Sequence, residues 1–347
     1  MEQKHRVLVV GCGGIGGIFA SHLGGRSDVD LSVVSRNPSI VDAVRRDGLQ
    51  LLENGQKKVC TIDIHTSIPG GAFDFIFLAT QPPQVEDAAR DILPHLTSES
   101  RVVVLQNGLC EARVAEHIGS NRVLGGIVTF GASTDGPGQV RRTSKGGVVI
   151  GAYSGHSDSA MDRLQQLLDG IGVITTTQNL KGARYSKLAL NCAVSGLGTL
   201  AGVRLGTLLN SPKARNLALA VMREAVEVSK AEGIELEPIG GTFDLNWLAN
   251  PQASWSGPAH WQRHAMLMVV GFKYRKLRSS MLSAIERGRP AAVDFLNGEV
   301  VNMGSIHGIP TPINRDVAQL IHDIAEGKTH SDPAHLHRLC VHIDKIE

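Results

Sequence analysis

The sequence predicts an α/β domain built on a doubly wound, mainly parallel sheet, followed by an all-α domain. Short apolar runs alternate with helical segments in the first half of the chain, and glycines follow the first run at once. After about residue 178 the strand patterns stop and long helical patterns replace them. A chain of 347 residues also favours two domains over one. We therefore expect the α/β domain at 1–178 and the helical domain at 179–347.

The apolar runs of the first half are expected to be the strands of the sheet. They lie at 6–10 (RVLVV), 29–36 (VDLSVVSR), 73–80 (FDFIFLAT), 101–108 (RVVVLQNG), 122–133 (RVLGGIVTFGAS) and 146–153 (GGVVIGAY). Helical patterns intervene at about 14–25, 38–47, 82–93 and 109–118. This alternation indicates parallel strands with helices on both faces of the sheet.

The second half reads as a series of helices. One begins with Ser211 as its cap and Pro212 in its first turn, and it stops at Gly233. The segment 260–288 predicts either one long helix or a helix pair, and further helices are expected within 292–308 and 312–327. The segment 238–258 contains Gly, Pro and two Trp residues and is expected to be a loop.

Composition restricts the class of protein. The hydrophobic content of 42% and the formal net charge of +2 are typical of a soluble globular protein without a basic field for nucleic acid. Five widely spaced cysteines without a CxxC pair favour reduced thiols in a cytoplasmic protein and no metal site. The chain enters a strand at once, so we expect no signal peptide, and no apolar run approaches the roughly 20 residues of a membrane-spanning helix.

A glycine motif follows the first predicted strand and opens the first predicted helix. It has the form G-x-G-x-x-G, with glycines at 11, 13 and 16. In this context it predicts a Rossmann domain, in which the turn approaches a pyrophosphate at a helix N-terminus. The alternative is a glycine-rich turn with a structural role only. The residues expected to contact the cofactor here are Gly11, Cys12, Gly13, Gly14, Ile15 and Gly16.

The end of the second predicted strand indicates which nicotinamide cofactor is bound. An NAD site usually has Asp or Glu there, whereas Ser35 and Arg36 occupy these positions and can bind a 2′-phosphate. We therefore predict NADP(H), the alternative being that Arg36 is a solvated surface arginine. Asn107 follows the fourth predicted strand, where it either lies near the nicotinamide or forms an ordinary Asn-Gly turn.

A polar row occurs in an otherwise apolar helical segment, ARYSKLALNCAVSG. Lys187, Asn191 and Ser195 follow one another at four-residue intervals, which places them on one face of an α-helix. A lysine facing a cleft can donate a proton to a carbonyl oxygen and stabilise the developing alkoxide, and partial burial would lower its pKa. The alternative is a helix surface with a solvated lysine and a hydrogen-bonded asparagine.

Five segments, in this order, resemble those of the ketopantoate reductase family. They are the G-x-G-x-x-G start, the arginine after the second strand, QNG at 106–108, SKLALNC at 186–192, and SSM at 279–281 followed by VDFLNG. The resemblance runs from about residue 5 to about 325. It implies an NADPH domain and a helical domain with the site in the cleft between them. It also implies reduction of a branched 2-oxo acid (2-dehydropantoate) to its 2-hydroxy acid (pantoate), a step toward pantothenate and coenzyme A.

The resemblance also implies roles for single residues. Lys187 matches the general acid and Asn191 a substrate-binding asparagine. Asn107 matches an asparagine that contacts both cofactor and substrate. Ser280 matches a substrate-binding hydroxyl, and Ala132 matches a backbone contact to the cofactor.

Four positions depart from the family pattern. A lysine after the third strand is Gln81 here, a second asparagine of the lysine helix is Ser195, a glutamate is Ala292, and a polar loop residue is Leu205. Gln81 and Ser195 are still expected to face cofactor and substrate, respectively. The proton donor and the glycine loop are thus retained, whereas the residues that select the substrate are not. Beside Leu205, Arg204 either anchors a substrate carboxylate or is a surface arginine.

Two alternatives to the ketopantoate reductase assignment therefore remain. One is a reductase of a different 2-oxo acid or ketone with an altered pocket, and the other is a catalytically silent NADP(H)-binding sensor. Packing or surface positions are expected for the remaining histidines and tryptophans, which are His260, His264, His307, Trp247, Trp255 and Trp261. The apolar helical domain is compatible with a homodimer, but the sequence does not fix the oligomeric state.

Overall fold

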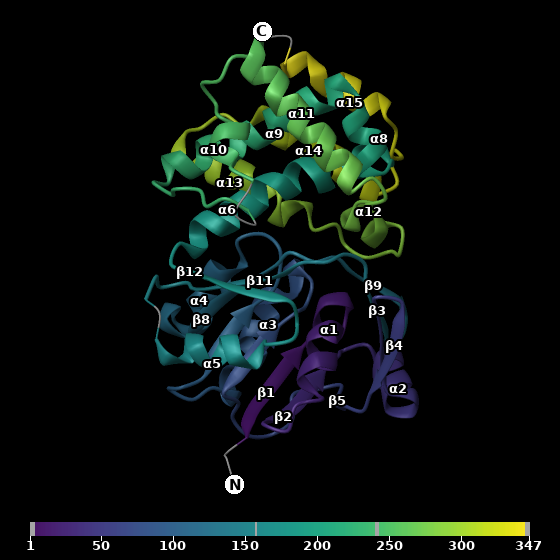
Figure 1. Cartoon of the computed structure of the whole chain (residues 1–347), viewed down its shortest axis with the longest axis vertical. Helices are drawn as coiled ribbons and strands as arrows, with labels where there is room; N and C mark the ends of the chain where they lie inside the picture. Colours follow the sequence, from purple (N-terminus) through teal and green to yellow (C-terminus); the bar gives the residue numbers. More distant parts are fainter. Residues whose placement is uncertain (1–3, 157, 240–242, 344–347) are drawn as a thin grey trace. The chain divides into compact units, whose positions relative to one another are not determined.

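The computed structural model describes residues 4–156, 158–239 and 243–343. The chain divides into two compact units, Met1–Leu180 and Lys181–Glu347. The first is the α/β domain and the second is helical, so the predicted fold class is confirmed (Figure 1).

The first unit is built around an eight-stranded sheet. Its order is β12-β11-β8-β7-β6-β1-β2-β5, and all neighbours are parallel except β11 and β8. The central strands are short runs of Val, Ile, Leu and Phe with both faces buried, as expected where helices cover both sides. The strands are β1 (His5–Val10), β2 (Val29–Val34), β5 (Asp63–His65), β6 (Phe75–Leu78), β7 (Arg101–Val104), β8 (Val123–Val128), β11 (Gly147–Ala152) and β12 (Val173–Thr177).

The helices of this unit begin and end where local chemistry favours it. Asn37 caps α2 by accepting from the N–H of Ser39, and Asp158 caps α5 by accepting from the N–H of Ala160. The helices are α1 (Gly14–Leu23), α2 (Pro38–Asp47), α3 (Val85–Asp91), α4 (Cys110–Ile118) and α5 (Ser159–Leu167), with 3₁₀ turns η1 (Pro82–Gln84), η2 (Leu93–His95) and η3 (Ser120–Arg122). The expected helix at 82–93 is thus a short α-helix between two 3₁₀ turns.

A second sheet was not predicted. It has the order β4-β3-β10-β9 and packs on α1, where a Cβ on Gly17 would lie 2.5 Å from Val140 Cγ1. The expected single strand at 122–133 is therefore wrong, because the chain leaves the large sheet after β8 and starts β9 in the small one. The strands of the second sheet are β3 (Leu49–Glu53), β4 (Gln56–Cys60), β9 (Ala132–Gly136) and β10 (Gln139–Arg142).

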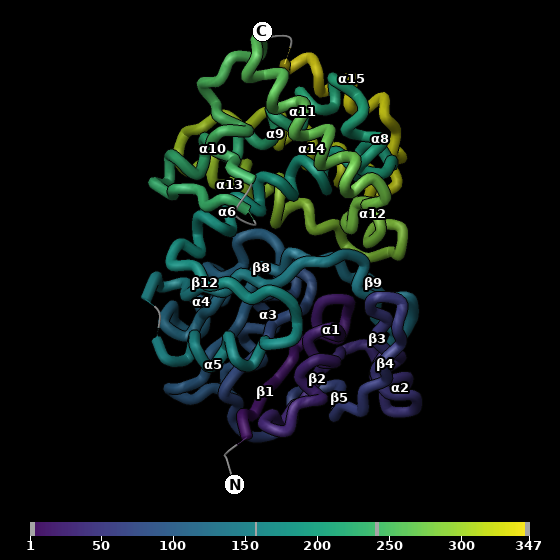
Figure 2. Tube along the Cα trace, viewed as in Figure 1, coloured from purple at the N-terminus to yellow at the C-terminus, as the bar shows by residue number. Residues whose placement is uncertain are grey.

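The described part of the second unit is helical apart from one isolated bridge between Ile239 and Phe243. Its central helix, α9, is capped by Ser211 and has most of its residues buried beside α13 and α14 (Figures 1 and 2). The helices are α6 (Leu180–Asn191), the π-helical η4 (Cys192–Gly196), α7 (Leu197–Ala201), α8 (Leu205–Asn210), α9 (Pro212–Ala231), α10 (Leu245–Leu248), α11 (Pro258–Lys273), α12 (Ser280–Ile285), η5 (Val293–Phe295), α13 (Asn297–His307), α14 (Pro312–Ala325), α15 (Ala334–Leu339) and η6 (Cys340–His342).

Two expectations for the helical half are resolved. The segment 260–288 is a helix pair, α11 and α12, separated at 274–279. The expected loop at 238–258 contains the one-turn helix α10, and residues 240–242 of it lie outside the described residues. In the described parts of the chain, none of the helices combines the length and the apolar character needed to cross a membrane.

Candidate functional site

Several predicted cofactor residues lie at one edge of the large sheet. The strands β2, β1, β6 and β7 are neighbours and run parallel, so their carboxyl ends meet at that edge. Ser35 follows β2, Gly11 follows β1, and Asn107 lies just beyond β7. In open α/β sheets, ligands bind beyond the carboxyl ends of the strands. The first unit thus presents its predicted cofactor residues where a dinucleotide binds in this fold.

The glycines of the loop are required by close approaches of the backbone. Gly11 has a φ of +104°, and a Cβ there would lie 2.8 Å from the carbonyl of Ala79. A Cβ on Gly16 would lie 1.8 Å from the carbonyl oxygen of Gly11, so α1 packs directly on the turn. Gly13 has open space where its Cβ would be, and no acidic residue occupies the first turn of α1. These features suit an anionic group at the helix N-terminus.

The other residues of the loop have clear positions. The Cys12 side chain is buried in the core, which raises the pKa of its thiol to about 12, so only its backbone can face a ligand. Ile15 packs partly against the same core. A Cβ on Gly14 would lie 3.1 Å from the carbonyl carbon of Ala132. The structure therefore brings Ala132 next to the first residue of α1, although the two are far apart in sequence.

Arg36 is exposed but has a partner that was not predicted. Its Nη2 lies 2.5 Å from Oδ2 of Asp91, the last residue of α3. Both side chains are about half exposed, and such surface pairs contribute only about 0–1 kcal/mol. Another anion can therefore replace the Asp91 carboxylate as the partner of Arg36. No feature of the sequence indicated Asp91, because the two residues are 55 positions apart in the chain.

The ends of β6 and β7 are joined by side chains. Gln106 donates from Nε2 to Thr80 Oγ1 at 3.0 Å, and Gln106 is buried. Gln81 follows Thr80, is exposed and precedes the turn η1, whereas Asn107 is exposed and its carbonyl accepts from Cys110 Sγ at 3.4 Å. Thr80 was missed by sequence reasoning, although a polar residue directly after a buried strand is the pattern that also indicated Asn107.

In the second unit, Lys187 and Asn191 share the last turns of α6. They are four residues apart in regular α-helix and both are intermediate in burial. After Asn191 the helix becomes π-helical, over Cys192–Gly196. The α-helix that was expected to carry all three residues therefore ends at Asn191, and Ser195 lies in the π-helical turn that follows.

The backbone carbonyl of Ser195 accepts two hydrogen bonds. Its carbonyl accepts from Thr199 Oγ1 at 2.7 Å and from Ser279 Oγ at 3.0 Å. Ser279 also caps α12 by accepting from the N–H of Leu282, whereas its neighbour Ser280 is exposed. Ser279 thus connects α12 to the π-helical turn, and Ser280 remains available to a ligand at the start of α12.

A buried asparagine of α13 contacts the same turn. Asn297 donates from Nδ2 to the carbonyl of Cys192 at 3.3 Å and to Oδ1 of Asn314 at 2.9 Å. A Cβ on Gly196 would lie 3.0 Å from Asn297 Oδ1, so the glycine leaves room for this asparagine. Asn314 in turn donates to the carboxylate of Glu224 on α9 at 2.7 Å. This network fixes the π-helical turn against α9, α13 and α14.

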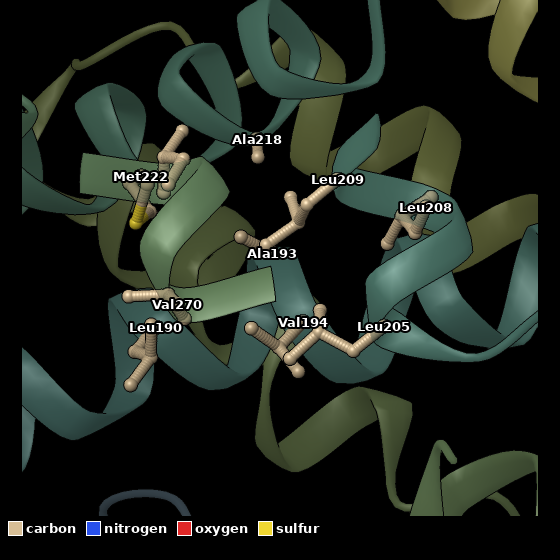
Figure 3. A pocket seen from close by; sticks show the side chains of 10 residues that line it. Leu190, Ala193, Val194, Leu205, Leu208, Leu209, Ala218, Met222 and Val270 are labelled. Carbon is tan, nitrogen blue, oxygen red and sulfur yellow. The ribbon is translucent and has the colours of Figure 1, made fainter. Parts of the chain in front are cut away.

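Leu205 lies in an apolar environment. It lines a small cavity between α6, the π-helical turn, α8, α9 and α11, shown in Figure 3. The lining is aliphatic apart from one methionine and consists of Leu190, Ala193, Val194, Leu205, Leu208, Leu209, Ala218, Met222, Leu267 and Val270. With a volume of about 10 Å³, the cavity has room for no more than a water-sized group. Arg204, next to Leu205, is exposed, and Ala292 precedes the turn η5.

Two of the histidines are packed, as expected. His260 and His264 are buried with ring centroids 4.3 Å apart, and burial lowers the pKa of His264 to about 4. His307 lies 3.5 Å from Glu232. The guanidinium of Arg223 lies over the ring of Trp255, with its Cζ atom 3.7 Å from the ring centroid. Within the described residues, no three His, Cys, Asp or Glu side chains gather to hold a metal ion.

Comparison with known proteins identifies relatives of both units. The pattern described as "Ketopantoate reductase PanE/ApbA" matches residues 7–155, and its C-terminal counterpart matches residues 179–325. A 2-dehydropantoate 2-reductase of Pyrococcus horikoshii is 25% identical over 313 residues, which cover 89% of this chain and 94% of the relative. The two family patterns together span most of the protein.

Solved structures show the same fold. A PanE/ApbA family ketopantoate reductase from Ralstonia eutropha has a TM-score of 0.77 at 24% identity, over 94% of this chain and all of the other. A D-mandelate dehydrogenase solved with NADH and anilino(oxo)acetate has a TM-score of 0.79 at 21% identity, over 93% and 99% of the two chains. From these matches and the retained motifs, we conclude that the chain belongs to the ketopantoate reductase family, whose members are oxidoreductases acting on the CH–OH/C=O pair.

Proposed function

We propose that the protein reduces a 2-oxo acid, 2-dehydropantoate, to its 2-hydroxy acid, pantoate, with NADPH as the reductant. The observation that carries this proposal is the pair formed by Lys187 and Asn191, one α-helical turn apart and directly before a π-helical turn. Such turns are frequent at functional sites. The pair supplies one proton donor and one amide on the same face of α6.

The first unit offers the features that NADP(H) needs. Its glycine turn leaves open space at Gly13, and the uncharged first turn of α1 accommodates a pyrophosphate. Arg36 supplies a positive charge at the end of β2, where the 2′-phosphate of NADP(H) is bound in this fold. When bound, the reduced nicotinamide supplies the hydride for the reaction.

The protein's own contribution is proton transfer and positioning. The ammonium of Lys187 donates a hydrogen bond to the ketone oxygen of the substrate and stabilises the negative charge that develops there. As the C2 carbon gains the hydride, the carbonyl π bond breaks and the Nζ proton moves to oxygen, which gives the alcohol and a neutral amine. Solvent returns the proton to Lys187. Asn191 orients the substrate through its amide.

A different 2-oxo acid is the second candidate for the substrate. Two observations favour it: Leu205 is buried among aliphatic side chains, and Ala292 stands where a carboxylate is usual in the family. The D-mandelate dehydrogenase with a similar fold was solved with an aromatic oxo acid derivative, anilino(oxo)acetate. A less polar site would favour an oxo acid with an apolar substituent over one with a hydroxyl group.

Steady-state kinetics with a matched set of 2-oxo acids tests the proposal. The set comprises 2-dehydropantoate, the same skeleton without its hydroxyl group, pyruvate and phenylglyoxylate, each with NADPH. We expect the highest kcat/KM for 2-dehydropantoate, by about 10-fold or more over the compound without the hydroxyl group. A higher value for that compound or for phenylglyoxylate would transfer the assignment to the second candidate. NADPH binding without turnover of any of the four would favour the silent sensor.

A further inference from the structure

Arg223 of α9 has a buried guanidinium with one edge that lacks hydrogen-bond partners. Its exposed fraction is 6%, and among the described residues its Nε and Nη2 atoms have no hydrogen-bond partner. These two atoms, called the Arg223 edge below, form the fork with which an arginine binds both oxygens of one anion. Arg26 uses the same two atoms to bind the carboxylate of Asp28, at 3.0 and 2.8 Å. Buried donors are seldom left unpaired, so the Arg223 edge is a candidate binding site.

The positive charge of Arg223 has no acidic partner in contact. Glu227, one turn further along α9, acts on it electrostatically, but in the described parts of the chain Arg223 forms no ion pair. Burial and the charge of Arg263 lower the pKa of Arg223 to about 10, which leaves the guanidinium charged at neutral pH. A charge removed from water without a counter-ion is unfavourable, so an anion at this edge would stabilise the fold.

A second buried guanidinium adds to this charge. Arg263 of α11 is 5% exposed and donates to the carbonyls of Trp247 and Ser254, at 3.2 and 3.4 Å. Both acceptors are neutral, so they do not balance its charge. Glu227 is only partly buried, and solvent screens much of its effect. The two arginines together therefore favour an anion that carries more than one charge.

Trp255 holds the face of the Arg223 guanidinium and does not use the donors of its edge. The Cζ atom lies 3.7 Å from the ring centroid, which is a cation–π contact and requires no N–H group. His260, in the first turn of α11, lies 6.1 Å from the same ring in a T-shaped arrangement. Because α11 begins with neither a side-chain cap nor an acidic residue in its first turn, its N-terminus adds a positive potential.

We propose that the Arg223 edge binds one inorganic phosphate ion. Phosphate presents two oxygens to the fork, and as a dianion it balances the charges of Arg223 and Arg263. A small ion is favoured over a larger phosphorylated molecule, because the two arginines expose only 6% and 5% of their surfaces. None of these residues is among those that bind cofactor or substrate in the proposed function. The ion therefore stabilises the helical unit and takes no part in the reduction.

Isothermal titration calorimetry with inorganic phosphate tests this inference. The full-length protein is saturated with NADPH, so that phosphate does not bind in the cofactor site, and chloride keeps the ionic strength constant. The wild type should bind phosphate at a single site. Arg223→Met should weaken this binding by at least about 30-fold, and Arg223→Lys, which keeps the charge but loses the fork, by at least about 10-fold. Arg315→Met, at an exposed arginine of α14, is the matched control and should bind phosphate as the wild type does.

Thermal unfolding of the same proteins gives a second readout. The midpoint of the wild type and of Arg315→Met should rise by about 2 °C or more in about 10 mM phosphate, because a ligand of the folded state stabilises it. Arg223→Met should lack this rise. Without phosphate its midpoint should equal or exceed that of the wild type, because methionine removes an unpaired buried charge and still packs on Trp255.

The inference would be overturned if the wild type bound no phosphate at about 10 mM, or if Arg223→Met bound it equally well. It would also be overturned if Arg223→Met and Glu227→Gln lost stability equally without phosphate, because the two residues would then pair with each other. Glycerol 3-phosphate should bind at least about 10-fold more weakly than phosphate, and equal affinity would assign the site to a larger phosphorylated molecule instead. Neither readout involves turnover, so the result is independent of the substrate assignment.

Discussion

Asn297 donates from Nδ2 to the carbonyl oxygen of Cys192 at 3.3 Å, at the first residue of the π-helical turn that follows Lys187 and Asn191. The asparagine is fully buried and also donates to Asn314. A π turn interrupts the regular ladder of backbone hydrogen bonds, and a side-chain donor stabilises one of the carbonyls involved. A residue of α13 therefore helps determine where α6 ends and how its two polar residues are held.

Replacing Asn297 by Ala should affect both stability and catalysis. The change leaves the carbonyl of Cys192 and the side chain of Asn314 each without one partner in a buried region, at a cost of about 1–3 kcal/mol in the free energy of unfolding. Displacement of Lys187 and Asn191 should lower kcat by about 10-fold or more, while the dissociation constant for NADPH stays close to that of the wild type. Urea unfolding and steady-state kinetics measure these effects.

Asn302→Ala provides the comparison for this substitution, because Asn302 is exposed on the same helix. Its effect on stability should be within about 0.5 kcal/mol. If the folded Asn297→Ala protein turned over as fast as the wild type, the π-helical turn would not depend on this asparagine for its catalytic geometry.

Glu224 should make stability depend on pH. Burial raises the pKa of its carboxyl to about 7, although hydrogen bonds from Ile313 and Asn314 act in the opposite direction. In the unfolded chain the pKa is near 4.5, so between these values the folded state binds the proton more strongly. The stabilisation is therefore complete below about pH 4.5 and is lost as pH rises through about 7, by up to about 3 kcal/mol.

Urea unfolding of wild type and Glu224→Gln at intervals from pH 4.5 to 8 isolates this contribution. The variant should be less stable at every pH, because its amide cannot accept all the hydrogen bonds, but the difference between the two proteins should shrink as pH rises. A difference that is constant across the range would show that Glu224 does not titrate in this window.

The pair formed by Arg36 and Asp91 predicts a change in cofactor preference. Asp91→Asn removes a carboxylate that competes for the guanidinium and repels a 2′-phosphate. Affinity for NADPH should rise by about 3- to 10-fold, whereas affinity for NADH should stay the same. Arg36→Ala should weaken NADPH by about 10-fold or more with little effect on NADH. Fluorescence titration of the reduced cofactors measures both.

Arg46→Ala is the control for Arg36, because Arg46 forms a similar exposed pair with Asp47 at the end of α2. It should leave both affinities unchanged. Equal losses of NADPH and NADH affinity in Arg36→Ala would exclude Arg36 as the residue that selects NADP(H).

Much of the first unit could be predicted because its strands are continuous apolar runs and its glycines follow a strand directly. The second sheet could not, since β4 (QKKVC) exposes four of its five residues and carries no apolar alternation. Its two hairpins, β3 with β4 and β9 with β10, are joined by the pairing of β3 with β10, which are distant in sequence. Hydrophobic periodicity contains no information on such partners.

The site shows the same limit. A four-residue spacing correctly placed Lys187 and Asn191 on one α-helical face, because regular helix continues through both. It did not predict the change to a π-helical turn after Asn191, which Asn297 from a distant helix contacts. The partner of Arg36 was missed for a similar reason: Asp91 is brought to it by packing, not by sequence.

The central claim is that Lys187 is the proton donor, and single-turnover hydride transfer of Lys187→Ala tests it most directly. The decay of NADPH absorbance is followed after mixing saturated enzyme with 2-dehydropantoate, beside wild type and Lys213→Ala, which replaces an exposed lysine of α9. We predict a loss of at least about 100-fold in the hydride-transfer rate for Lys187→Ala only, with NADPH binding nearly intact. An unchanged rate in Lys187→Ala would contradict the assignment of this lysine as the general acid.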